Sequence, residues 1–154
     1  MKRAFLIKFF ASGLLTGYSP IVPGTTGTIP AWLLAYFMLG RNPDLIIIFS
    51  VAFIIISVFL AGKAEPLLGH DAKKIVIDEW AGMMISLIMI PYSLTNYILA
   101  FLAFRALDAV KFFPANVAER LPRGWGVTAD DVVAGIQANL LTQLLIYVGH
   151  FVTK

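Results

Sequence analysis

The sequence predicts an all-α integral membrane protein with about five membrane helices, some of them short, plus an N-terminal interfacial helix. Of its 154 residues, 59% are hydrophobic and only 14% are charged, and the mean hydropathy is +0.83. Lys, Arg, Asp and Glu are absent from four long stretches, 9–40, 45–62, 80–104 and 132–153. A helix needs about 20 apolar residues to cross the hydrocarbon layer. We therefore expect one membrane-embedded domain over residues 1–154.

The N-terminal sequence MKRAFLIKFF predicts the interfacial helix, with its three basic side chains near the lipid headgroups. Glycine and proline interrupt the stretch 9–40 between 17 and 27, so the first membrane helix is expected to begin near Thr28, with Pro30 in its first turn. It should end at the turn sequence GRNP, residues 40–43. The second membrane helix is expected over 45–61, and the last over 132–147.

The stretch 80–104 contains PYSLTN at 91–96, so it can form one kinked helix or a hairpin of two short helices. The positive-inside rule favours the hairpin, because it places the loops 1–27, 62–79 and 108–130 together on the cytoplasmic side. The basic residues of these loops are Lys2, Arg3, Lys8, Lys63, Lys73, Lys74, Lys111, Arg120 and Arg123. The C-terminus should then lie outside, and every acidic residue except Asp44 on the cytoplasmic side.

Three predicted helix ends bring carboxylates to this face. Asp78 and Glu79 precede the third membrane helix, Asp108 ends the fourth, and Asp130 and Asp131 open the fifth. Charges at membrane depth are costly and are therefore candidates for function, and clustered hard oxygen ligands suit Mg²⁺. The alternative is helix capping, since aspartate stabilises helix N-termini. When Asp130 is considered by itself, we favour capping. When the five acids are considered as a cluster, we favour a metal site.

The segment FRALDAVK offers basic side chains for an anion. Arg105, Asp108 and Lys111 are spaced three apart, so on a helix the two cations flank the acid. A planar guanidinium suits a phosphate, which makes Arg105 a phosphate-binding candidate. The alternative is an ordinary ladder of ion pairs. For Lys111, ion pairing and phosphate binding are equally favoured.

The segment SPIVPGTTGT offers a second anion site. Its backbone N–H groups and hydroxyls precede a predicted helix and could cradle a phosphate. The hydroxyls belong to Thr25, Thr26 and Thr28. Taken alone the signal is weak, because glycine and proline are common in any loop.

Other classes of function are excluded or disfavoured. The chain has no cysteine, which excludes disulfides, thiolate zinc sites and cysteine nucleophiles. Its basic residues are scattered, so no nucleic-acid partner is indicated. The non-enzymatic alternatives are a small membrane transporter or channel, or a structural membrane subunit, whose acidic cluster binds cations. A channel needs a polar path, whereas 45–62 and 132–153 contain no Asp, Glu, Lys or Arg.

Four segments in order, SPIVPGTTGT, DxxxIVIDEWAGM, FRxLDxxKxxP and GxGVTxDDVVAG, resemble the phosphatidylglycerophosphatase A family. The similarity covers residues 12–140, with Phe112 standing where the family often has proline. It implies a Mg²⁺-dependent, multi-pass phosphatase of the bacterial cytoplasmic (inner) membrane. The implied reaction converts phosphatidylglycerophosphate to phosphatidylglycerol and phosphate in phospholipid biosynthesis, with the active site on the cytoplasmic face.

The resemblance also implies roles for individual residues. The expected metal-binding residues are Asp71, Asp78, Glu79, Asp108, Asp130 and Asp131. The expected catalytic residues are Asp78, Glu79, Asp108 and Asp131. The expected substrate-binding residues are Thr25, Thr26, Thr28, Arg105 and Lys111. Which carboxylate acts as the base, whether an aspartyl-phosphate forms, and the oligomeric state all stay open.

Overall fold

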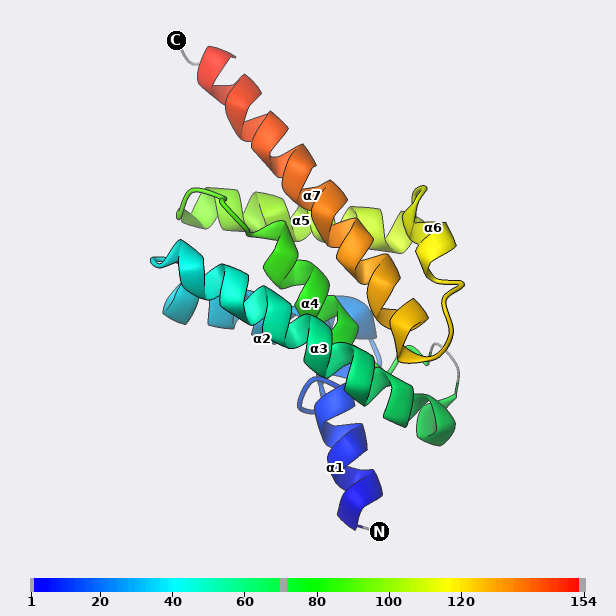
Figure 1. Cartoon of the computed structure of the whole chain (residues 1–154). Helices are drawn as coiled ribbons and strands as arrows, with labels where there is room; N and C mark the ends of the chain where they lie inside the picture. Colours follow the sequence, from blue (N-terminus) through cyan, green and yellow to red (C-terminus); the bar gives the residue numbers. More distant parts are fainter. Residues whose placement is uncertain (1, 70–71, 153–154) are drawn as a thin grey trace.

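A computed structural model describes residues 2–69 and 72–152, and all regular elements in these ranges are helical (Figure 1). The all-α prediction is therefore confirmed. In chain order the elements are α1 (Lys2–Ala11), η1 (Thr16–Tyr18), α2 (Pro23–Leu34), η2 (Ala35–Leu39), α3 (Pro43–Leu68), α4 (Ile77–Ser86), α5 (Leu94–Val110), α6 (Ala115–Ala118) and α7 (Gly124–Val152).

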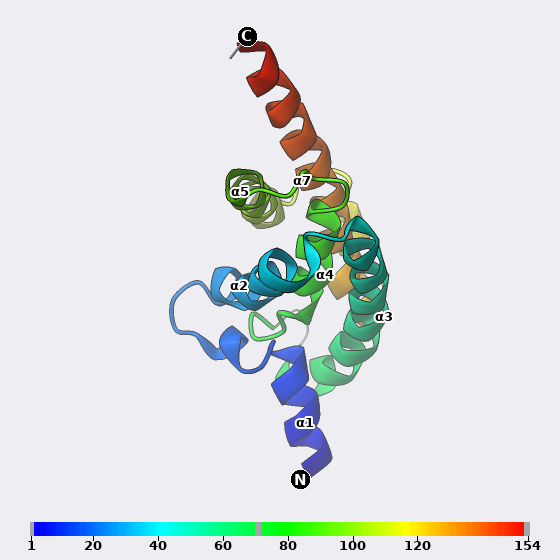
Figure 2. The same ribbon diagram turned by 90° about the vertical axis from the view of Figure 1, so that its left-hand side faces the viewer.

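Helix α4 is the centre of the structure. All ten of its residues are buried, and it contacts α2, α3, α5 and α7. Figure 2 shows α3 on one side of α4, and α2 and α5 on the other. Asp78 and Glu79 lie in the first turn of this helix. The packing that buries α4 therefore also draws two carboxylates into the interior, where ionised groups need a compensating partner.

Two helices in the described part of the chain are long and apolar enough to cross a membrane, α3 with 26 residues and α7 with 29. Within an apolar 18-residue stretch of each helix, only 28% of the residues of α3 and 22% of those of α7 are buried. A core helix of a water-soluble protein would instead be mostly buried. Both helices extend beyond the ranges 45–61 and 132–147 that the sequence predicted.

The third and fourth predicted membrane helices are short, in agreement with the expectation that some would be. Helix α4 has 10 residues and α5 has 17, so α4 is about 15 Å long against a hydrocarbon layer of about 30 Å. Among the described residues, two helices rather than about five therefore reach the length of a membrane span. The N-terminal helix is present as α1; its place at the membrane interface stays a prediction.

The division of 80–104 into two helices is confirmed, since α4 ends at Ser86 and α5 begins at Leu94; that these two helices form a membrane hairpin stays a prediction. The Ser93 hydroxyl caps α5 by accepting a hydrogen bond from the N–H of Asn96 at 3.1 Å. The predicted start of the first membrane helix is wrong. Helix α2 begins at Pro23, which fits the first turn of a helix, and Pro30 lies in its interior.

Helices α4 and α7 approach each other closely through Gly82 and Gly135. A Cβ atom on Gly135 would collide with the carbonyl oxygen of Gly82 and lie only 3.0 Å from its Cα. Asp78 lies one helical turn before Gly82, and Asp131 lies one turn before Gly135. The glycine contact therefore sets how far apart the acids of the two helices are.

We expect Gly135→Ala to destabilise the protein by about 1–3 kcal/mol, because a tightly packed contact has no room for the added methyl group. Thermal unfolding of the purified protein in detergent measures this. The matched control is Gly149→Ala in the same helix, where no described atom lies within 4 Å of the added Cβ. Similar melting temperatures for the two variants would contradict the close packing of α4 on α7.

Candidate active site

Most of the predicted site residues line one cavity of about 580 Å³. It collects residues from all three of the loop regions that the sequence placed on one face, together with the adjoining helix ends. Helix α2 and the residue before it contribute Val22, Pro23 and Gly24; the segment before α4 contributes Ala72, Lys73 and Ile75; and α4 contributes Asp78 and Glu79. The remaining lining residues are Arg105, Asp108, Ala109, Lys111, Asp130 and Asp131.

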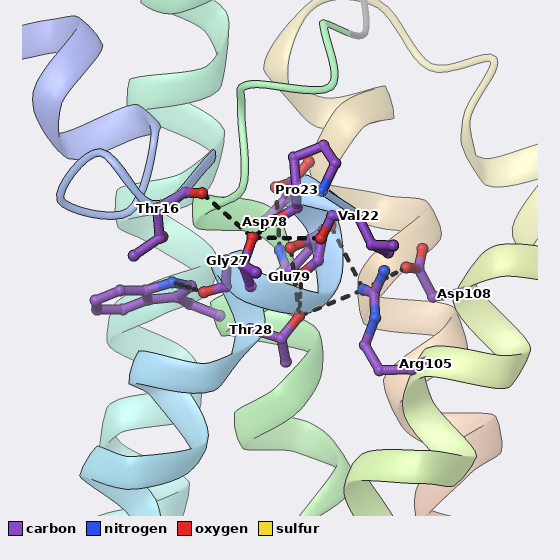
Figure 3. Close-up of polar contacts among 12 residues, drawn as sticks. Thr16, Val22, Pro23, Gly27, Thr28, Asp78, Glu79, Arg105 and Asp108 are labelled. Atoms are coloured by element: carbon purple, nitrogen blue, oxygen red, sulfur yellow. Dashed lines mark hydrogen bonds and ion pairs between the residues drawn. The ribbon is translucent and has the colours of Figure 1, made fainter. Parts of the chain in front are cut away.

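Arg105 connects α5 to α2 and α4 (Figure 3). Its Nη1 atom lies 2.7 Å from Oδ2 of Asp108 and 3.4 Å from Oε1 of Glu79. The same nitrogen donates a hydrogen bond to the hydroxyl of Thr28 at 3.3 Å. The Nε atom is buried and has no hydrogen-bond partner among the described residues. Two carboxylates and a hydroxyl from three helices thus fix the position of the guanidinium.

The start of α2 fits tightly against this network. The Thr28 hydroxyl lies 2.8 Å from the carbonyl oxygen of Gly24 and 3.3 Å from Oε2 of Glu79. A Cβ atom on Gly24 would collide with the Glu79 carboxylate and the Arg105 guanidinium. Glycine is needed here because the backbone of α2 passes directly against the charged groups of the cavity.

Lys111 holds the α7 side of the cavity. Its Nζ atom lies 2.8 Å from Oδ2 of Asp130 and 2.9 Å from Oε1 of Glu119. The other carboxylate oxygen of Asp130 is buried and has no hydrogen-bond partner among the described residues. The adjacent Asp131 is also buried, with 4% of its surface exposed. Helix α7 therefore presents two carboxylates of which only one is paired with a cation.

Burial dominates the electrostatics of α4. Asp78 and Glu79 are only 6% and 9% exposed, so little water can stabilise their charges. Five carboxylates line the cavity, against three basic side chains, Lys73, Arg105 and Lys111. The cavity therefore holds more acidic groups than its basic side chains can neutralise.

The donor set suits a hard divalent cation. Carboxylate oxygens are preferred ligands of Mg²⁺, which usually binds through one or two of them and keeps several waters. One buried carboxylate oxygen, that of Asp130, is unpartnered. Within the described ranges no three acidic or histidine side chains converge into a ready-made site, and Mg²⁺ does not require three. The residues present therefore fit Mg²⁺.

Some predicted residues lie elsewhere. Thr26 does not line the cavity, since its hydroxyl donates to the backbone oxygens of Pro23 and Thr16 at 3.0 and 3.3 Å. Thr25 lines a separate apolar groove. Asp71 lies outside the described residues. Sequence reasoning missed Glu119 as a neighbour of the site, because only the fold brings it to Lys111. It also assigned Lys73 to the basic residues of the loops rather than to the cavity that it lines.

The fold and the cavity define a class: a helical protein with buried carboxylates, an arginine and a lysine arranged for the chemistry of a phosphate group. The family model described as "Phosphatidylglycerophosphatase A" matches residues 9–146. The chain belongs to the phosphatidylglycerophosphatase A family. The family resemblance seen in the sequence motifs and the prediction of a phosphatase are thereby confirmed.

Two of three similar proteins support this membership by name. The phosphatidylglycerophosphatase A of Escherichia coli K12 is 35% identical over 91% of this chain and 81% of its own length. That of Haemophilus influenzae is 32% identical over 92% and 89%. A protein named "Putative phosphatidylinositol-3-phosphatase" from Bacteroides thetaiotaomicron is 34% identical over 92% and 94%. No solved structure matches the chain.

Proposed function

We propose that this protein hydrolyses phosphatidylglycerophosphate to phosphatidylglycerol and phosphate, with Mg²⁺ as cofactor. The observation that carries the proposal is the cavity itself, where Arg105 and Lys111 lie among buried carboxylates of α4, α5 and α7. Two of the relatives bear the name phosphatidylglycerophosphatase A. A phosphoinositide is the second candidate substrate, since the name of the third relative refers to one.

The ion pairs suggest how the acids divide their work. Glu79 and Asp108 contact Arg105, so they orient the guanidinium toward the phosphate oxygens. Asp78 and Asp131 form no ion pair with a described residue. One or two of the carboxylates of Asp78, Asp130 and Asp131 would hold Mg²⁺, which would keep several waters. When bound, the ion neutralises phosphate charge and lowers the pKa of a coordinated water.

The chain's own residues account for the remaining steps. Arg105 and Lys111 bind phosphate oxygens and stabilise the charge that spreads over them in the transition state. A bond forms between phosphorus and the water oxygen, and the bond from phosphorus to the glycerol oxygen breaks. A cavity carboxylate accepts a proton from the water and passes it, directly or through solvent, to the departing glycerol oxygen.

We also propose that the protein is embedded in the bacterial cytoplasmic membrane with the cavity at the cytoplasmic face. The exposed apolar residues of α3 and α7 support this, as does the distribution of basic residues in the loops. In this arrangement α3 and α7 cross the bilayer, while α2 with η2, α4 and α5 complete the five predicted membrane helices as shorter segments. A topology reporter fused after residue 154 should lie outside; a cytoplasmic reporter would contradict the arrangement.

A lipid panel tests the substrate assignment. The purified protein in detergent is supplied with Mg²⁺ and, separately, with phosphatidylglycerophosphate, phosphatidylinositol 3-phosphate and phosphatidic acid. We expect phosphate release to be fastest from phosphatidylglycerophosphate. Preference for the phosphoinositide would reassign the substrate. Release from none of the lipids would overturn the phosphatase proposal and favour a cation-binding channel or structural subunit.

A further inference from the structure

We propose that the apolar groove between α2 and α5 holds an acyl chain of the lipid substrate and selects lipid over water-soluble phosphate esters. The inference rests on the proposed function, and adds a binding site to it. The groove has a volume of about 270 Å³. Its lining residues are Thr25, Ile29, Trp32 and Leu33 of α2, and Ile98 and Phe101 of α5.

The groove leads away from the active site along two antiparallel helices. Thr28 of α2 hydrogen-bonds Arg105 of α5 on the side of the cavity. Farther along, the indole N–H of Trp32 donates to the carbonyl oxygen of Tyr97 at 2.8 Å. Figure 2 shows α2 and α5 adjacent to each other on one side of α4. A molecule whose phosphate contacts Arg105 can therefore extend along both helices without crossing another element.

The cavity and the groove adjoin each other, because residues close together in α2 and in α5 line both. Gly24 lines the cavity, and the next residue, Thr25, lines the groove. On α5, Phe101 lies one helical turn before Arg105. In phosphatidylglycerophosphate a glycerol and a phosphodiester separate the terminal phosphate from the acyl esters, so a headgroup that fills the cavity leaves its acyl chains at the near end of the groove.

The walls of the groove are fixed and its rim is exposed. The hydrogen bond to Tyr97 holds the Trp32 ring, which packs edge-on against Phe101 with ring centroids 6.4 Å apart. At the rim, Ile29, Leu33 and Ile98 are 41%, 41% and 44% exposed. A preformed apolar groove with an exposed apolar rim suits a hydrocarbon chain that arrives from a lipid layer.

The side chains that line the groove indicate which kind of molecule it can bind. Charged side chains are absent from the described residues that line the groove, so both phosphates of the headgroup would stay in the adjoining cavity. Lys73, Arg105 and Lys111 line that cavity and supply positive charge for them. The observations therefore favour one molecule with a phosphorylated head and an apolar tail over a separate soluble ligand.

Substitutions that make the groove polar or fill it test this proposal. Ile29→Gln and Ile98→Gln place an amide at the rim, and Leu33→Trp fills the groove with a larger apolar ring. Leu102→Gln is the matched control, since Leu102 is an exposed apolar residue of α5 outside the groove. Each variant is assayed with phosphatidylglycerophosphate carrying long acyl chains and with the same phosphorylated headgroup lacking acyl chains. Melting temperature and oligomeric state are measured alongside.

We expect each groove variant to raise KM for the long-chain lipid about tenfold and to leave kcat/KM for the chain-free headgroup within about twofold of wild type. The control should match wild type on both substrates. Equal losses on both substrates, or no loss on either, would overturn the groove assignment while leaving the phosphatase in place. A changed oligomeric state would assign the groove to a second copy instead. A wild type that releases no phosphate from any substrate would overturn the proposed function, and the groove assignment with it.

Discussion

Asp78→Asn should abolish phosphate release while the protein still folds. Asp78 is 6% exposed, lies at the centre of the structure and forms no ion pair with a described residue, so its carboxylate remains for a metal ion. Losing a metal ligand should cost several kcal/mol of transition-state stabilisation, or a decrease of about 10³-fold in kcat. The measurement is phosphate release from phosphatidylglycerophosphate under saturating Mg²⁺.

Two further results separate chemistry from folding. Asparagine cannot ionise and needs no partner for a buried charge, so the metal-free variant should melt at or above the temperature of the metal-free wild type. The control is Asp44→Asn, since Asp44 lies in the exposed first turn of α3. This variant should release phosphate at the wild-type rate. Near-normal Mg²⁺-dependent activity of Asp78→Asn would show that Asp78 does not hold the metal.

Arg105→Ala should give the second large effect, a decrease of about 10²–10³-fold in kcat. The guanidinium lies against Glu79, Asp108 and Thr28 at the same time, and it is the group that best suits the phosphate. Its removal also leaves two carboxylates without their cation, so the melting temperature should fall as well. Kinetics and thermal unfolding on the same preparation measure both effects.

Arg105→Lys distinguishes phosphate binding from charge balance alone. Lysine keeps the positive charge but lacks the planar fork that contacts several acceptors at once. It should therefore restore most of the melting temperature and little of kcat. If lysine restores both equally, Arg105 acts through charge balance, and its assigned contact with the phosphate is wrong.

The sequence predicted the composition of the site better than its geometry. Asp78, Glu79, Asp108, Asp130 and Asp131 were grouped because positive-inside topology placed their loops on one face, and all five line one cavity in the structure. Loop sidedness says nothing about pairing, however. That Glu79 and Asp108 share Arg105, while Asp130 pairs with Lys111, depends on how α4, α5 and α7 pack.

Helix boundaries were predicted less well, for a physical reason. Proline and glycine at 20–27 predict a loop, yet Pro23 occupies the first turn of α2, where its missing N–H costs nothing. The prediction of Thr25 and Thr26 as phosphate ligands assumed a loop in front of the helix. Within a helix these side chains point to different neighbours, and only Thr28 contacts Arg105. Glu119 was missed because only the tertiary fold brings it to Lys111.

The most direct test of the central claim is phosphate release from phosphatidylglycerophosphate by the purified wild type as Mg²⁺ is titrated after treatment with EDTA. We expect no phosphate release by the wild type in EDTA and a recovery of its activity that saturates with Mg²⁺. Asp78→Asn should show no recovery of activity at the same Mg²⁺ concentrations. Full turnover by the wild type in EDTA would contradict a metal-dependent site. Full recovery by Asp78→Asn would contradict the assignment of that site to the cavity around α4.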